Sequence, residues 1–195
     1  MPRATHFINA FYGATYTIKI DLTNSNPSSC CSYEDDAVGM TAGSDDWDSM
    51  PIFKDIKPCV FKDGKVNYYL NPNDFTLKED ETAAVLTGAD GDVMIEFPKF
   101  AFKIETDTAN NILTVSITNN KNVVANDNTY KYYAFARDSI GDLDHFYYGA
   151  FKGSLDSDGK LRSVSGATPT NNKTLAAFEA TAQLNGTNYH IVNYF

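Results

Sequence analysis

The residue types that most often perform chemistry are sparse in this sequence, and their spacing matches no known catalytic pattern. The three histidines, His6, His145 and His190, lie far apart, and none belongs to a His-x-His or His-Glu-x-x-His spacing. The chain also has no nucleophile elbow, no glycine-rich phosphate loop and no dinucleotide fingerprint. We therefore name no catalytic residue, and we expect a protein that is not an enzyme and uses no cofactor.

The cysteines and carboxylates do not form a metal-binding pattern either. Cys30 and Cys31 are adjacent and Cys59 stands alone, and an odd count without regular spacing predicts free thiols. Asp156-x-Asp158-Gly159 resembles the start of a calcium loop but lacks the acidic residue at the far end, so we expect a hairpin turn there. The acidic stretch around residues 34–48 could bind a divalent cation, but runs of charge are usually solvated, and we assign no metal site.

Aromatic residues are the remaining candidates for recognition. The single tryptophan, Trp47, lies among three aspartates, and Tyr147 and Tyr148 form one of several tyrosine pairs in strand-like runs. We name Trp47, Tyr147 and Tyr148 as candidate ligand-binding residues, because aromatic faces bind neutral sugars. Two other interpretations stay open: Trp47 could anchor a polar loop to the core, and each tyrosine pair could place one ring inwards and one outwards.

Composition limits the class of partner. The chain has 195 residues, of which 43% are hydrophobic and 13% aromatic, so most of it should fold, and its aromatic content suits strands. Its 16 basic and 25 acidic residues give a net charge of −9. This charge argues against nucleic-acid binding through a basic face. No apolar run is long enough to cross a membrane, and the N-terminal residues do not read as a signal peptide.

Hydrophobic periodicity predicts mostly strands. Period-two alternation predicts strands at 15–22, 59–70, 93–104, 112–118 and 146–152, with further extended runs at 130–136 and 189–195. Asp63-Gly64 predicts a tight hairpin turn, and a change of phase at Pro98 predicts a bulge or a sheet edge. One helix is predicted at 172–185, and residues 33–55 are predicted to be a long surface loop or linker.

Several spaced blocks of the sequence resemble bacteriophage tail proteins. The blocks are residues 92–100, the run Tyr147-Tyr148-Gly149-Ala150-Phe151-Lys152-Gly153-Ser154, residues 159–169 and Asn185-Gly186-Thr187-Asn188-Tyr189. They resemble receptor-binding and minor tail proteins that contain a C-type-lectin-like domain of the formylglycine-generating-enzyme type. The resemblance covers only the first half of such a domain. The opening residues 17–27 are similar to the segment that leads into it.

The resemblance and the pattern together give a set of expectations. The fold class is mainly β (α+β): antiparallel sheets, one main helix and a partial C-type-lectin-like domain. An N-terminal β arm and acidic loop would occupy residues 1–48, and a β-rich lectin-like domain would occupy 49–195. The resemblance implies a virion tail structural protein or adhesin, made in the bacterial host cytoplasm, that attaches to the host cell.

The same resemblance implies partners. They are other virion tail proteins and a host-surface glycan or protein, with no nucleic acid and no membrane insertion. The chain itself would form a homo-oligomer, with a trimer favoured. The main alternative is a bacterial carbohydrate-binding module or cell-surface lectin, and an unrelated β-rich structural protein also remains open.

Overall fold

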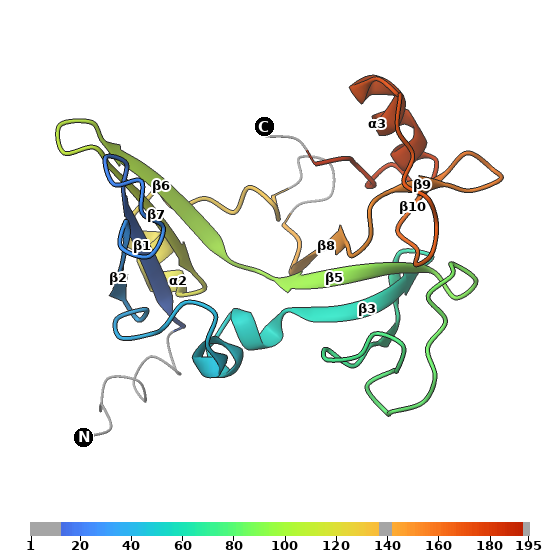
Figure 1. The fold of residues 1–195 in the computed structure, drawn as a ribbon, viewed down its shortest axis with the longest axis horizontal. Helices are drawn as coiled ribbons and strands as arrows, with labels where there is room; N and C mark the ends of the chain where they lie inside the picture. The colour runs from blue at the N-terminus through green and yellow to red at the C-terminus, as the bar shows by residue number, and fades with distance from the viewer. Residues whose placement is uncertain (1–12, 137–141, 193–195) are drawn as a thin grey trace. The chain divides into compact units, whose positions relative to one another are not determined.

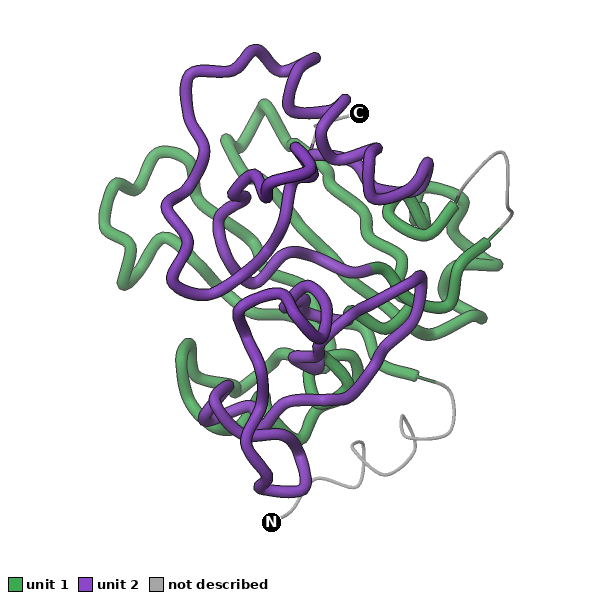
Figure 2. Tube along the Cα trace, turned by 90° about the vertical axis from the view of Figure 1, so that its right-hand side faces the viewer, with its two compact units in different colours: residues 1–56, 97–146 green, residues 57–96, 147–195 purple. Residues whose placement is uncertain are grey.

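The protein folds into two compact units, each built from two separate stretches of chain. A computed structural model describes residues 13–136 and 142–192. Unit 1 comprises residues 1–56 and 97–146, and unit 2 comprises residues 57–96 and 147–195 (Figure 2). The chain therefore passes between the units more than once. The predicted domains, 1–48 and 49–195, have other boundaries than these units, and that division stays a prediction.

The fold is mainly β, as predicted, with three antiparallel sheets and two short α-helices among the described residues (Figure 1). In the described part of the chain, no helix has the length and apolar character needed to cross a bilayer.

Unit 1 is built on a four-stranded sheet in the order β2-β1-β7-β6. Its strands are β1 (Thr15–Asp21), β2 (Cys31–Asp35), β6 (Ala101–Asp107) and β7 (Ile112–Thr118). The strands predicted at 15–22 and 112–118 are thus confirmed. One face of the sheet is lined by hydroxyl groups that bond across the strands, such as Thr17 to Ser116 at 2.7 Å. The opposite face carries the aliphatic residues that alternate with them.

The segment after β2 closes one end of the aliphatic face. Tyr16 is only 4% exposed and forms a core cluster with Ala14, Ala37 and Ile52. Two 3₁₀ turns, η1 (Asp45–Ser49) and η2 (Phe53–Asp55), bring Trp47 and Phe53 onto this cluster. The expectation of a surface loop or linker at 33–55 was therefore wrong, because scattered apolar residues in an acidic stretch form part of the core.

Two further elements of unit 1 differ from the prediction. Residues 130–136 do not form a strand: Lys131 makes an isolated bridge to Phe102, and a turn follows. A short helix that periodicity did not indicate, α2 (Lys121–Asn126), begins after Asn120. The Asn120 side chain accepts hydrogen bonds from the backbone N–H groups of Asn122 and Val123, which is the usual chemistry of an N-cap.

Unit 2 is built mainly on a second four-stranded sheet, in the order β4-β3-β5-β8. Its strands are β3 (Lys57–Lys62), β4 (Lys65–Tyr69), β5 (Asp92–Pro98) and β8 (His145–Gly149), although residues 97–98 of β5 and 145–146 of β8 are counted in unit 1. Asp63 and Gly64 join β3 to β4 with positive φ angles of 52° and 80°, which confirms the predicted Asp-Gly hairpin. Val60, Leu70 and Val93 are buried on one face of this sheet.

Pro98 separates two strands rather than interrupting one. The predicted strand 93–104 is divided into β5, which belongs to the second sheet, and β6, which belongs to the first. Proline has no N–H to donate to a ladder, so pairing ends there. The change of phase in the sequence therefore marks the point where the chain leaves one sheet for another.

The rest of unit 2 consists of a small hairpin and a helix. Strands β9 (Ser154–Leu155) and β10 (Leu161–Arg162) flank the Asp156–Gly159 turn, which confirms a hairpin there. Helix α3 (Leu175–Gln183), capped by Thr174, confirms the predicted helix with shorter bounds. Residues 189–192 are not a strand, and the end of that predicted run, 193–195, lies outside the described residues.

Candidate functional site

An open surface hollow lies in unit 2, beside the end of β4. It has a volume of about 300 Å³ and is lined by Tyr68, Tyr69, Lys78, Glu79 and Asp80. Tyr68 supplies its aromatic ring, Tyr69 borders it at the end of β4, and three charged residues of the following loop form its polar part. The hollow is open and shallow, at the lower end of the size range of ligand sites.

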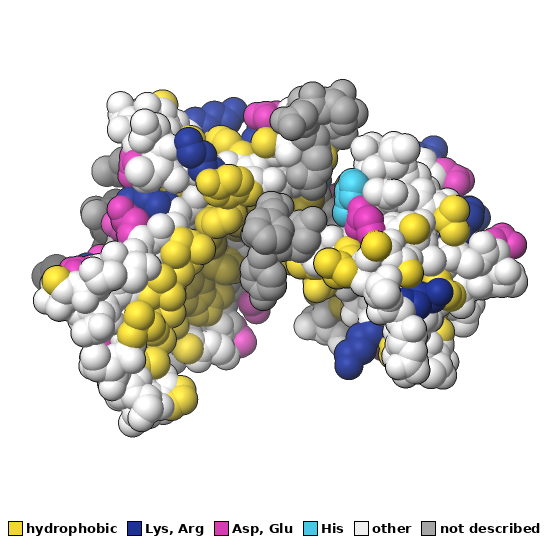
Figure 3. Space-filling view, turned by 90° about the horizontal axis from the view of Figure 1, so that it is seen from above, with side chains coloured by type: hydrophobic (Ala, Val, Ile, Leu, Met, Phe, Trp, Pro, Cys, Tyr) yellow, Lys and Arg dark blue, Asp and Glu magenta, His cyan; other side chains and the backbone are white. Residues whose placement is uncertain are grey.

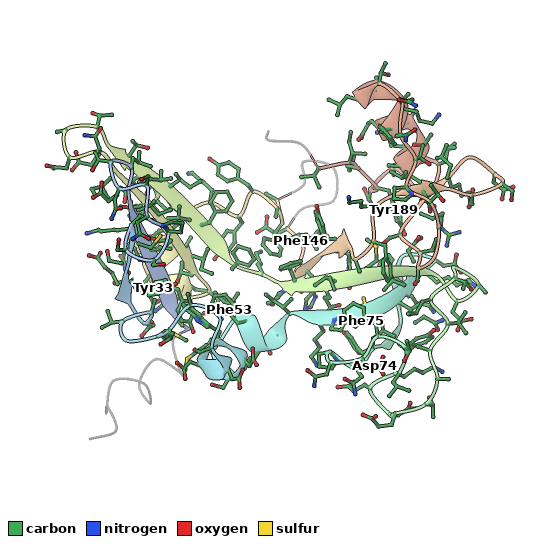
Figure 4. All side chains as sticks on the ribbon, viewed as in Figure 1. Tyr33, Phe53, Asp74, Phe75, Phe146 and Tyr189 are labelled. Atoms are coloured by element: carbon green, nitrogen blue, oxygen red, sulfur yellow. The ribbon has the colours of Figure 1, made fainter. Side chains whose placement is uncertain are left out.

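The loop that supplies the charged residues is held by local hydrogen bonds. Asp74, labelled in Figure 4 next to Phe75, accepts hydrogen bonds from the backbone N–H and the hydroxyl of Thr76 at 2.9 and 2.6 Å. Asp80 accepts the same pair from Thr82. An isolated bridge between Leu70 and Lys78 ties the loop to the end of β4. Such side-chain turns fix the backbone without a regular element.

The Tyr68 side chain is held through its hydroxyl and through one face of its ring. Its hydroxyl donates to Asp90 Oδ2 at 3.0 Å and accepts from the Val85 N–H at 3.1 Å. Lys78 Nζ lies 4.6 Å from the ring centroid, within the range of a cation–π contact. Partial burial raises the pKa of the Tyr68 hydroxyl, which keeps it protonated. The ring is therefore held rigidly beside the hollow, with the Lys78 ammonium over one of its faces.

Tyr69 points to the other face of the sheet, where it belongs to a buried polar cluster. Its hydroxyl donates to Glu96 Oε1 at 3.0 Å, and Tyr147 donates to Glu96 Oε2 at 2.8 Å. Glu96 is only 5% exposed, so both carboxylate oxygens have a donor where water has little access. Lys57 Nζ lies 5.1 Å from the Tyr69 ring centroid.

Burial sets the protonation of this cluster. Desolvation, followed by the hydrogen bond to Glu96, raises the pKa of Tyr69 to about 12. The same two causes raise the pKa of Tyr147 further. Cys59, fully buried on the neighbouring strand, has its pKa raised to about 12 by burial and by the charge of Glu96. Both phenols and the thiol therefore stay neutral at physiological pH, which suits a role in holding rings in place rather than proton transfer.

Trp47 lies in unit 1 as part of the packing around Tyr16. Its ring centroid is 5.0 Å from that of Phe53, 5.7 Å from Tyr33 and 6.0 Å from Tyr16. The indole N–H donates to the Thr41 carbonyl at 2.8 Å. These contacts are those of an aromatic anchor. A ligand-binding role for Trp47 stays a prediction.

Tyr147 and Tyr148 lie on opposite faces of β8. Tyr147 packs on Phe61, with ring centroids 4.3 Å apart, and bonds to Glu96. Tyr148 is 51% exposed. Neither lines the hollow beside β4, and their predicted binding role also stays a prediction.

The polar residues of the hollow were missed by the sequence analysis. Tyr68 and Tyr69 are visible in the sequence as a tyrosine pair, but Lys78, Glu79 and Asp80 belong to no motif or predicted element. Their position depends on two aspartate–threonine turns. A repeated Asp-x-Thr spacing was the signal that could have found them.

The other reactive side chains are dispersed. Cys30 and Cys31 have their Sγ atoms 3.4 Å apart, and Cys59 is buried alone. His190 Nδ1 lies 2.6 Å from Glu179 Oε1, His145 is exposed on β8, and His6 falls outside the described residues. Within residues 13–136 and 142–192, no group of three or more histidine, cysteine, aspartate or glutamate side chains could hold a metal ion.

Comparisons of the chain with models of protein families, with curated proteins and with solved structures found no match.

Proposed function

We propose that this chain is a non-enzymatic binding protein, and that the hollow beside β4 binds neutral carbohydrate. The observation that supports the proposal is the combination of the fixed Tyr68 ring with Lys78, Glu79 and Asp80 around one open hollow. Carbohydrates are bound by aromatic faces, which pack on C–H groups of the sugar ring, and by charged or amide groups, which bond to its hydroxyls.

The shape of the hollow also favours a sugar polymer. A shallow, open hollow can receive one or two rings of a chain that continues past it on either side, whereas a small metabolite is usually enclosed. The rigid mounting of Tyr68 and of the Asp74–Thr82 loop reduces the entropy lost on binding.

Charge restricts which polymers fit. The net charge of −9 disfavours phosphate-rich or otherwise anionic polymers, because the protein field repels them at long range. Glu79 and Asp80 add local negative charge at the hollow itself. We therefore propose neutral hexose or N-acetylhexosamine chains as the class of ligand.

The setting that we propose is a virion tail, where the chain would act as a structural protein and adhesin on the host surface. The support is the sequence resemblance in residues 92–189 to tail proteins with a C-type-lectin-like domain. The mainly β fold with helix α3 is compatible with a partial domain of that kind. The alternative is a bacterial carbohydrate-binding module or cell-surface lectin, which would use the same hollow.

Calorimetric titration with a panel of neutral oligosaccharides tests the proposal. Glu79→Gln removes one charge from the hollow, and Lys78→Ala removes the cation over Tyr68. Asp158→Asn and Lys173→Ala make matched changes elsewhere in unit 2. We expect both hollow variants to weaken binding by about tenfold, equivalent to about 1.4 kcal/mol, and both controls to bind as the parent does. Absence of binding to every neutral glycan, or equal binding by all four variants, would contradict the proposal.

A further inference from the structure

We infer that the aliphatic face of the sheet β2-β1-β7-β6 is the contact surface between two copies of this chain. Figure 3 shows a band of hydrophobic side chains across the part of the molecule that contains this sheet. The inference concerns unit 1 and does not depend on the carbohydrate hollow in unit 2.

The strand register places one apolar row across the whole sheet. Ile18 pairs with Tyr33 on one side and with Val115 on the other, and Val115 pairs in turn with Ile104. Paired residues in adjacent strands point to the same face. The next row contains Cys31, Ile20, Leu113 and Thr106. These two rows carry no charged side chain.

The two rows are accessible within unit 1. The segment around Trp47 covers the end of the face near Tyr16 and Ile117, where the core cluster lies. Away from that cluster, Ile104 is 58% exposed, and the aliphatic residues of β1 and β7 in these rows are only partly buried. The hydroxyl-rich face on the other side includes the buried residues Thr17, Ser116 and Thr118. A contiguous apolar face of this kind marks an interaction surface.

The chemistry of the face selects its partner. Its two rows offer mainly aliphatic groups, and their only polar groups are the hydroxyls of Tyr33 and Thr106 and the thiol of Cys31, so a glycan or a nucleic acid would find few groups to bind. A flat, twisted and uncharged apolar surface is its complement, and a second copy of the same face has those properties. Two sheets of the same twist pack face to face at about −30°. The Lys19–Glu34 and Lys103–Glu105 ion pairs lie on the opposite face, so the contact would bury none of these charges.

The available area sets the strength of the contact. Three strands of seven residues and one of five, at about 3.4 Å per residue and about 4.8 Å apart, give a face of roughly 420 Å² in plan, part of which the Trp47 segment covers. Two such faces together stay below the size of a stable specific interface and match a weak, transient contact. We therefore expect a symmetric dimer with a dissociation constant of about 10–100 µM, and not the trimer favoured by the sequence analysis.

Sedimentation velocity of the full chain, from low concentration to about 500 µM, tests the inference. We expect a monomer–dimer equilibrium that shifts towards dimer as NaCl screens the repulsion between two copies of charge −9. Ile104→Lys places a charge on the face and should weaken association by at least about tenfold. Thr108→Lys makes the same change of charge in the turn between β6 and β7 and should leave association unchanged.

A second variant distinguishes loss of the dimer from loss of the fold. Val115→Thr keeps a β-branched residue in β7 but places a hydroxyl at the middle of the apolar row, so it should also weaken the dimer while the circular dichroism spectrum stays unchanged. A chain that stays monomeric at every concentration and salt level would overturn the inference. A trimer, or a dimer that neither variant weakens, would overturn it as well.

Discussion

The hydroxyl of Tyr147 lies 2.8 Å from Glu96 Oε2 and donates a hydrogen bond to a carboxylate that is almost fully buried. Tyr69, on the other edge strand of the sheet, donates to the second oxygen on the same face, at 3.0 Å. A buried carboxylate without such donors would be strongly destabilising. The pair therefore explains how Glu96 is tolerated in the middle of β5, and why two tyrosine rings are fixed on that face.

Adjacent tyrosines provide a matched test of this arrangement. Tyr147→Phe removes one hydrogen bond to a buried charged group and should lower the free energy of unfolding by about 2 kcal/mol. Tyr148→Phe removes a hydroxyl from a side chain that is 51% exposed and should change it by less than about 0.5 kcal/mol. Urea denaturation of both variants measures the difference. Equal stabilities would show that the Glu96 contact contributes nothing.

Stability should fall in alkaline solution because the buried cluster resists ionisation. Cys59 and Tyr69 ionise at ordinary pKa values of 9.0 and 10.0 when unfolded, but both pKa values rise to about 12 in the fold. Their contribution is complete below pH 9 and is lost as the pH rises through the folded values, since the unfolded chain releases its protons first.

A cysteine variant isolates one part of this alkaline loss. Cys59→Ala removes the titration of the buried thiol, so the urea midpoint should decline less steeply between pH 9.0 and 10.0 than in the parent protein. The comparison uses the pH dependence and not the absolute stability, because the small cavity left by the substitution acts at every pH. Identical pH profiles for parent and variant would refute the assignment.

Stability should also fall in acid, through the aspartates that close turns. The hydrogen bonds from Thr129, with a smaller contribution from Lys103, lower the pKa of Asp127 from 3.8 to about 2. Asp21, Asp74 and Asp80 have lowered pKa values, caused mainly by the threonine two residues later in each case. Such groups contribute stability above their ordinary pKa and lose it as the pH falls through the folded value.

One substitution tests whether Asp127 contributes to the loss of stability in acid. Asp127→Asn keeps an oxygen that can accept the turn hydrogen bonds but removes the titration, so thermal unfolding should depend less on pH between 3.8 and about 2. A variant whose acid profile matches that of the parent would show that Asp127 does not contribute to acid sensitivity.

Trp47→Ala should destabilise unit 1. The indole contacts three other aromatic rings and donates a hydrogen bond, so its loss should cost about 3 kcal/mol. Glycan binding in unit 2 should be retained at a temperature where the variant is folded. A stable Trp47→Ala protein that no longer binds glycans would favour the ligand-binding interpretation of this residue instead.

The sequence predicted the elements of this fold better than their connections. Alternation located β1 and β7 within one residue, and Asp63-Gly64 located a hairpin, because both signals arise from local geometry. The passage of the chain from β5 to β6 between two sheets depends on long-range pairing. A single sequence shows only the break at Pro98.

The candidate site was less predictable for a similar reason. The tyrosine pairs were visible, but nothing in the pattern indicated that Tyr69 and Tyr147 share Glu96, which is 27 residues from one and 51 from the other. The role of Trp47 depends on a segment whose few apolar residues fold back onto β1. Acidic composition concealed that segment, because the charge of a loop says little about what its apolar residues contact.

Chemical-shift mapping with a neutral oligosaccharide tests the proposed function most directly. Isotope-labelled protein is titrated with a neutral oligosaccharide that binds in the calorimetric experiment. The largest changes in backbone amide chemical shift should occur at residues 68–69 and 78–80, and the changes at Trp47 and around the Asp156–Gly159 turn should be small. The same titration of Glu79→Gln should need about ten times more glycan to reach equal shifts. Shifts concentrated elsewhere in the folded protein, or none with any neutral glycan, would contradict the proposed site.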